Sequence, residues 1–235
     1  MKTLFTDSRC SGCHKATYLC KFFWNMIFQK IQANVELTDS DFNQIFTKKA
    51  REIADIHFTP IKIAKLAATY LATEKGLKIL DVGAGAGKFC MVGAACTEGY
   101  FVGVEQRKSF YNQACRIVKK HQIKNIEFIC ANIIDISFRD FDAFYVFNPF
   151  YENISRIGKI DKNVEFKPEF YLDYSEYVKN QLSLMPPGTK LVTYFSFMKE
   201  IPESYELQAA TYDNKLKFWE KLYWKRTTNI IIWIG

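Results

Sequence analysis

The sequence predicts an α/β fold with a mostly parallel central sheet, and three observations support this prediction. From residue 77 onward, short β-rich apolar runs alternate with helical stretches, as a parallel sheet with crossover helices requires. Glycines cluster directly after the first of these runs, at Gly83, Gly85 and Gly87. The chain of 235 residues is 49% hydrophobic and 16% aromatic, which is sufficient for one domain with a substantial buried core.

Apolar runs and turn residues predict seven strands and the helices between them. The parallel strands are expected at 77–82, 100–104, 126–131, 142–147 and 190–195, and the crossover helices at 88–97, 108–121 and 168–185. Pro186-Pro187-Gly188 closes the last of these helices. The tail breaks the repeat, because 205–211 and 229–234 resemble strands joined without a convincing crossover helix. An antiparallel C-terminal hairpin is therefore expected at one edge of the sheet.

The segment before residue 77 is predicted to be helical. Thr38 to Asp41 can cap a helix that runs to about His57, and Thr59 with Pro60 can open another that ends near Gly76. Residues 18–31 are rich in aromatic side chains and are expected to form a helix that packs on the core. We therefore divide the chain into an N-terminal helical extension, 1–58, and a main domain, 59–235.

The charged and sulfur-containing residues bear on partners and compartment. Lys and Arg number 32 against 25 Asp and Glu, and residues 1–35 hold a large part of this excess, which is compatible with a polyanionic partner. Seven cysteines do not suggest a disulfide framework, and no signal peptide or membrane span is evident, so a cytoplasmic protein is expected. Cys10, Cys13, His14 and Cys20 could bind a metal, but no second spaced pair is present and none is predicted. The role of residues 1–37 stays open.

The glycine-rich turn favours a ligand that carries an ammonium group. Backbone amides at such a turn, with the positive end of the following helix, can approach a ligand closely. A P-loop is excluded because Val82 stands where its first glycine should be and Phe89 follows Lys88. The glycines are spaced by two, unlike a dinucleotide fingerprint. Asp81, directly ahead of them, would repel a pyrophosphate but suits a ligand that bears an ammonium group.

The second predicted strand ends in Gly103-Val104-Glu105, where a carboxylate can bind the two hydroxyls of a ribose. Asp-x-Gly-x-Gly-x-Gly followed by this glutamate resembles motifs I and II of the class I, Rossmann-like S-adenosylmethionine (SAM)-dependent methyltransferases. That family has five parallel strands and a closing hairpin. Asn132 stands where the family commonly has an aspartate that accepts from the adenine amino group, with Asp135 as a rival. The resemblance implies SAM as cofactor and these binding residues: Asp81, Gly83, Ala84, Gly85, Gly87, Glu105, Gln106, Asn132, Ile133 and Asn148.

The fourth predicted strand ends in Asn148-Pro149-Phe150-Tyr151. This motif resembles the Asn-Pro-Pro-Tyr of enzymes that methylate a planar nitrogen, such as the adenine amino group or a glutamine amide. The resemblance implies that Asn148 and Pro149 accept the hydrogens of the target amino group and that Tyr151 stacks on its plane. Phe150 departs from the pattern and leaves the acceptor open. The segment is also similar to the Asn-Asn-Phe region of histone lysine methyltransferases without a SET domain, and Asn-Pro can simply mark a turn.

Three hypotheses on function follow. The first is a SAM-dependent methyltransferase that modifies a nitrogen of RNA or DNA, with RNA favoured over DNA and the adenine amino group favoured as acceptor. The second is a protein N-methyltransferase acting on lysine or glutamine. The third is a non-catalytic binding module with the same fold. A small-molecule acceptor also stays open, and the sequence does not indicate an oligomeric state.

Overall fold

A seven-stranded sheet forms the centre of the protein, in the order β3-β2-β1-β4-β5-β7-β6. The computed structural model describes residues 27–155, 160–161 and 164–223. Strands β1 to β5 are parallel, and β6 and β7 form an antiparallel hairpin beside β5. This confirms the predicted fold class. The strands are β1 (Lys78–Val82), β2 (Tyr100–Val104), β3 (Ile126–Ile129), β4 (Ala143–Phe147), β5 (Lys190–Tyr194), β6 (Tyr205–Thr211) and β7 (Leu216–Lys221).

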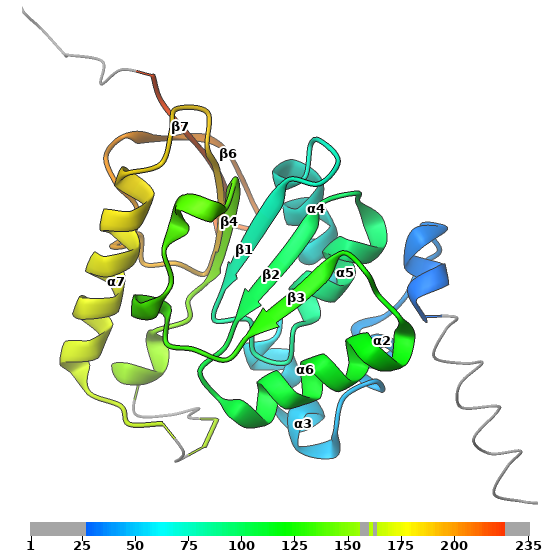
Figure 1. The fold of residues 1–235 in the computed structure, drawn as a ribbon. Helices are drawn as coiled ribbons and strands as arrows, with labels where there is room; N and C mark the ends of the chain where they lie inside the picture. The colour runs from blue at the N-terminus through cyan, green and yellow to red at the C-terminus, as the bar shows by residue number, and fades with distance from the viewer. Residues whose placement is uncertain (1–26, 156–159, 162–163, 224–235) are drawn as a thin grey trace, which may run out of the picture.

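Helices cover both faces of the sheet (Figure 1). Side chains alternate along β1, so Ile79 packs into the hydrophobic cluster under α4 and α5, whereas Leu80 and Val82 pack into the cluster under α7. Both faces of the sheet are therefore buried, as a parallel sheet with crossover helices requires. The main helices are α4 (Ile61–Leu71), α5 (Lys88–Cys96), α6 (Lys108–His121) and α7 (Pro168–Ser183), and short 3₁₀ turns are η1 (Ile133–Asp135), η2 (Phe138–Asp140) and η3 (Tyr151–Asn153).

The helices before β1 differ from the prediction at their ends. The single helix expected up to His57 is wrong, because α2 (Asp39–Asn43) and α3 (Lys48–His57) are separate and each has its own capping threonine, Thr38 and Thr47. Helix α4 begins at Ile61 with Pro60 as its N-cap and ends at Leu71, not near Gly76. Thr59 does not cap it. Its hydroxyl lies instead 3.0 Å from that of Tyr145, in the core.

The C-terminal hairpin is present, but its second strand is not the predicted one. Strand β6 pairs with Leu216–Lys221, which the sequence interpretation placed in the connection, and 229–234 lie outside the described residues. The turn holds Tyr212, Asp213 and Asn214 at φ of +52°, +54° and +62°. No glycine marks this left-handed turn, so the usual hairpin signal is missing.

The described N-terminal residues share their core with the sheet. Ile27, Phe42 and Phe46 belong to the cluster that contains Ile79. Asp39 on α2 accepts from the Ile61 amide at 2.9 Å and from Lys88 Nζ at 2.5 Å, so it joins the starts of α4 and α5. The division at residue 58 stays a prediction. None of the helices within the described ranges is long and apolar enough to cross a membrane.

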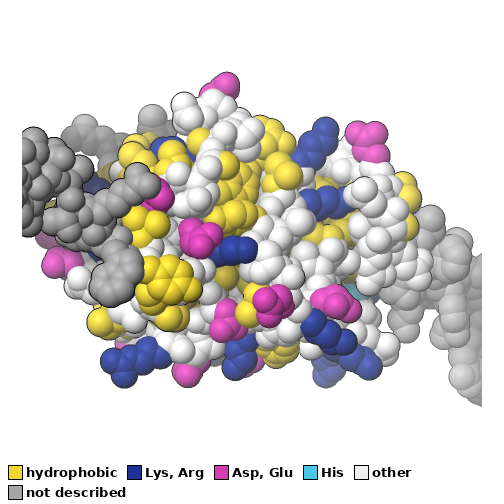
Figure 2. Space-filling view, turned by 90° about the horizontal axis from the view of Figure 1, so that it is seen from above, with side chains coloured by type: hydrophobic (Ala, Val, Ile, Leu, Met, Phe, Trp, Pro, Cys, Tyr) yellow, Lys and Arg dark blue, Asp and Glu magenta, His cyan; other side chains and the backbone are white. Residues whose placement is uncertain are grey.

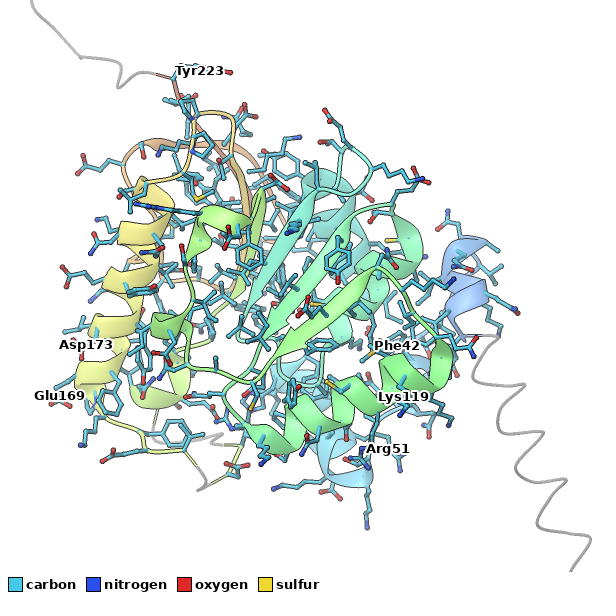
Figure 3. All side chains as sticks on the ribbon, in the orientation of Figure 1. Phe42, Arg51, Lys119, Glu169, Asp173 and Tyr223 are labelled. Carbon is cyan, nitrogen blue, oxygen red and sulfur yellow. The ribbon has the colours of Figure 1, made fainter. Side chains whose placement is uncertain are left out.

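Surface charge differs between faces. At the end where the parallel strands begin, basic and acidic side chains are interspersed around apolar ones (Figure 2). On α7, Glu169 and Asp173 point away from the sheet (Figure 3). Among the described residues seen in Figure 2, basic side chains do not form a continuous patch. The Cys10, Cys13, His14 and Cys20 cluster, which was considered for a metal but not predicted to bind one, lies outside the described residues.

Candidate functional site

A cavity of about 570 Å³ lies at the carboxyl ends of the parallel strands, within the size range of sites for small ligands. The loops after β1, β2, β3 and β4 all contribute to its wall. Residues predicted for cofactor or acceptor that line it are Gly83, Gly85, Glu105, Gln106, Asn132, Ile133, Asn148, Pro149 and Tyr151. Nine of the predicted residues therefore lie together at one cavity, and their roles stay predictions. Asp81, Ala84 and Gly87 do not line it.

The glycine turn brings two loops into contact. Gly83 has φ +78°, and a Cβ added there would lie 2.5 Å from Pro149 Cβ, so only glycine allows the two loops to approach this closely. Gly85, at φ +55°, donates its amide to Glu105 Oε2 at 2.8 Å. The Ala84 amide donates to the Val104 carbonyl at 2.8 Å and is therefore committed to the fold.

Gly87 serves helix packing. It is the N-cap of α5 at φ +82°, and a Cβ there would overlap the ring of Phe128 on β3. The predicted contact of Gly87 with the cofactor is not supported by its position, because it does not line the cavity. Its small size instead lets the start of α5 lie close to the sheet, behind the glycine turn.

Glu105 presents a buried carboxylate at the cavity wall. It is 4% exposed, and its Oε1 accepts from the Arg107 amide at 2.7 Å while Oε2 accepts from Gly85. Burial raises the pKa of Glu105, although these two amides and the Arg107 guanidinium oppose the shift. Each carboxylate oxygen retains a second lone pair. The side chain is thus fixed in orientation and can still accept from a ligand.

Asp81 lies behind the cavity. It shares the face of β1 with Ile79, so the strand alternation directs it under α5, where it is 3% exposed and accepts from Cys90 Sγ at 3.3 Å. Burial raises the pKa of Asp81 to about 7. It lines a much smaller second cavity with Gly83, Lys88 and Tyr145. Its predicted contact with the methionine moiety stays a prediction, and the carboxylate lies deeper than that role suggested.

The loop after β3 is held by its own side chains. Asn132 Oδ1 accepts from the Ile134 amide at 3.3 Å, and its Nδ2 donates to the Tyr174 hydroxyl at 3.0 Å. Ile133 is buried and adds an apolar surface to the wall, while Asp135 is exposed and does not line the cavity. Of the two residues proposed for the adenine contact, Asn132 has the favourable position.

The loop after β4 holds Asn148 in a strained conformation at the cavity wall. Its φ is +37°, a region that asparagine tolerates better than most residues, and its carbonyl accepts from the Tyr151 amide at 3.3 Å. Among the described residues, none forms a hydrogen bond with the Asn148 side chain. Phe150 packs inward against Tyr174, with ring centroids 5.4 Å apart, so this departure from the motif fills the core. Tyr151 is exposed at the cavity mouth.

Two groups at the cavity were missed by the sequence interpretation. Arg107, buried beside Glu105, forms an ion pair with Glu152, which ties the loop after β2 to the loop after β4. Tyr194, Phe195 and Phe197 at the end of β5 also line the wall. The aromatic group could have been predicted, because the carboxyl ends of all the parallel strands, β5 included, meet at the edge of the sheet where the cavity lies. No sequence pattern indicated the Arg107 pair.

Comparisons with known proteins agree with this geometry. A family model described as a methyltransferase domain matches residues 73–230, more than half of the chain, and the chain belongs to this family. The fold is similar to that of a methyltransferase from Geobacter sulfurreducens, with a TM-score of 0.57 and 11% identity over 84% of this chain and 97% of that one. No curated protein matches the chain.

Two further structures share the fold. An RNA methyltransferase from Salinibacter ruber, solved in complex with S-adenosyl-L-homocysteine, aligns with a TM-score of 0.51 and 14% identity over 72% of this chain and 96% of that one. TrmN from Thermus thermophilus aligns with a TM-score of 0.52 and 16% identity over 73% of this chain. The chain spans 52%, about half, of that TrmN chain.

The family match makes the protein a methyltransferase, and SAM is the cofactor that its sequence motifs predicted. The residues at the cavity fit an amino-acid nucleoside, because a fixed carboxylate, a glycine turn and the apolar Ile133 line one continuous space. This family membership favours an enzyme over a non-catalytic binding module.

Proposed function

We propose that the enzyme methylates an exocyclic amino nitrogen of RNA or DNA, with RNA as the preferred polymer and the adenine amino group as the preferred acceptor. The observation that carries the proposal is the Asn148 side chain, which lies at the cavity wall without a hydrogen bond to the described residues. A planar amino group needs acceptors in its own plane, and Asn148 Oδ1 with the Pro149 carbonyl supplies such a pair.

SAM, when bound, supplies an electrophilic methyl group. On this proposal Glu105, Asn132 and the glycine turn hold the cofactor, while Asn148 and Pro149 orient the lone pair of the target nitrogen toward it. Transfer of this kind depends mainly on alignment and the exclusion of water, so no strong base is required. Asparagine is not a base, and the role proposed for Asn148 does not require one.

Tyr151 is the proposed stacking residue. Tyr151 is 42% exposed at the cavity mouth, and the centre of its ring lies 5.8 Å from that of Phe197, so the pair offers a face to a planar base. Stacking of a base on an aromatic side chain contributes about 1–3 kcal/mol. A target in a duplex would first have to leave its stack. Single-stranded substrates are therefore expected to be methylated faster.

The likeness to an RNA methyltransferase is one of fold, so the proposal of nucleic acid depends on the site. The basic residues within 1–35, of which Lys30 alone is described, are proposed to contact phosphate as the sequence suggested. A cytoplasmic location, suggested by the cysteine content, is part of the same proposal.

The test is methylation of cell fractions with SAM that carries a radiolabelled methyl group. We expect label in the RNA fraction that ribonuclease removes and protease does not, and N6-methyladenosine after hydrolysis to nucleosides. Purified Asn148→Ala serves as the negative enzyme and Asn180→Ala, an exposed residue of α7, as the matched control. Label confined to a protein band and resistant to nuclease would contradict the proposal.

A protein acceptor is the second candidate, and one observation favours it. Asp55 on α3 lines the cavity and would suit the ammonium group of a lysine. Glu152 also lines it but is already paired with Arg107. In the same labelling experiment, protease-sensitive label with methyl-lysine or methyl-glutamine on hydrolysis would select this function.

A further inference from the structure

An exposed apolar strip continues from the cavity mouth along the end of β5. Phe195, Phe197 and Met198 are 44%, 55% and 45% exposed, and Tyr151 lies beside Phe197. We call these four residues the β5 rim. Large apolar side chains gathered at the entrance of a site are a common mark of a binding surface. Phe195 and Phe197 also line the cavity, so the rim is continuous with it.

The backbone holds the rim outward. Phe195 and Met198 have φ of +51° and +66°, a region that bulky residues rarely adopt. The conformation is fixed by two hydrogen bonds, from the Phe195 amide to the Lys215 carbonyl at 2.9 Å and from the Met198 amide to Ser196 Oγ at 2.8 Å. Strain of this kind at the mouth of a site is typical of a functional surface.

Two lysines of the β6–β7 hairpin lie against the rim. Lys215 Nζ is 5.4 Å from the centre of the Phe195 ring, and Lys217 Nζ is 3.2 Å from Met198 Sδ. Asp213 lies 3.8 Å from Lys215, but this pair is exposed and therefore weak. Cations interleaved with exposed aromatic rings are the pattern that binds single-stranded nucleic acid, because rings stack bases and cations neutralise phosphates.

Other charges near the cavity do not offer the same pattern. Glu105 and Glu152 are engaged by Arg107, and Asp55 is a carboxylate that would disfavour a phosphate on its side. The outer face of α7 is acidic at Glu169 and Asp173 (Figure 3). The hairpin side of the mouth thus combines aromatic surface with positive charge.

We propose that the β5 rim, with Lys215 and Lys217, is a subsite for the nucleotide next to the methylated one in a single-stranded nucleic acid. This inference rests on the proposed function and deepens it. The neighbouring base stacks on Phe197 and Tyr151, and each of its two flanking phosphates contacts one of the hairpin lysines. The subsite would hold the strand while the target base enters the cavity beside Asn148.

The experiment measures binding and methylation of one probe, a fluorescein-labelled single-stranded RNA of roughly 12 nucleotides that contains adenosine. Variants are Phe197→Ala and the double variant Lys215→Ala/Lys217→Ala. Leu172→Ala and Lys179→Ala, exposed residues of α7, are the matched controls. Fluorescence anisotropy gives the Kd at several salt concentrations, and calorimetry of SAM binding verifies that each variant is folded.

We expect Phe197→Ala to raise the Kd of the probe by roughly 10-fold, since base stacking contributes on this scale. The double lysine variant should lower the slope of log K against log salt by about 1.4, the value for two phosphate contacts on a single strand. The controls should match the wild type, and SAM affinity should not change.

Unchanged probe affinity and salt dependence in both rim variants would overturn the inference even if the RNA is methylated. Binding that depends on the rim without any methylation of the probe would support the subsite and contradict the proposed reaction. A labelled peptide of alternating glutamate and tyrosine is the competing probe. Rim-dependent binding of this peptide, with none of the RNA, would overturn the inference in favour of an acidic protein partner.

Discussion

The two halves of the cavity are built in different ways. In the half formed by the loops after β1, β2 and β3, glycines fit closely, and Glu105 and Asn132 already hold hydrogen bonds within the fold. In the half formed by the loops after β4 and β5, Asn148 and Phe195 have strained backbones and aromatic rings are exposed. A rigid half suits a constant cofactor, whereas an exposed half can differ with the acceptor.

The largest expected effect comes from Asn148→Ala. Loss of the acceptor that orients the target nitrogen should lower kcat by about 100-fold or more, since a misaligned group loses this much. The measurement is the initial rate of label transfer from SAM under saturating acceptor, with Asn180→Ala as control. A rate within a few-fold of the wild type would show that Asn148 does not act on the acceptor.

A smaller effect is expected where the two halves touch. Gly83→Ala places a Cβ against Pro149 and should displace the loop after β4, lowering kcat/KM by roughly 10-fold, which corresponds to about 1.4 kcal/mol. Gly76→Ala is the matched control, because Gly76 has nearly the same φ, +79°, and open space around it. The excess loss in Gly83→Ala over Gly76→Ala isolates the overlap. Equal losses in the two variants would show that the close approach of Gly83 to Pro149 does not matter for catalysis.

The last effect concerns stability and leaves the rate of methyl transfer aside. The folded pKa of Asp81, about 7, exceeds its ordinary value of 3.8, so the folded state binds more protons and stability falls as pH rises between these values. Asp81→Asn removes this ionisation and keeps an acceptor for Cys90. Thermal melts should show a higher Tm for the variant than for the wild type at pH 8, with a smaller difference at pH 5. Calorimetry should show weaker SAM binding by the variant. A Tm difference that does not grow with pH would show that ionisation of Asp81 does not lower the stability.

Most of the fold could be predicted from the sequence, because parallel strands buried on both faces leave distinct apolar runs between helices. The second hairpin strand was misplaced, since Tyr212 to Asn214 form a left-handed turn without glycine. The depth of Asp81 and the packing role of Gly87 follow from strand alternation and from contact with Phe128, which a motif does not encode. The pairing of Arg107 with Glu152 joins positions 45 residues apart in the sequence and could not be expected from either one.

The central claim is that the cofactor and the acceptor are held by separate halves of one cavity, and SAM calorimetry of two variants tests it most directly. Glu105→Gln sets an amide nitrogen against the Gly85 or Arg107 amide and should weaken SAM binding by roughly 10- to 100-fold. Asn148→Ala should keep most of the SAM affinity, although the motif resemblance also counts Asn148 among the binding residues. Glu176→Gln, an exposed control on α7, should match the wild type. Equal loss of SAM affinity in Glu105→Gln and Asn148→Ala, or full affinity in Glu105→Gln, would contradict the account.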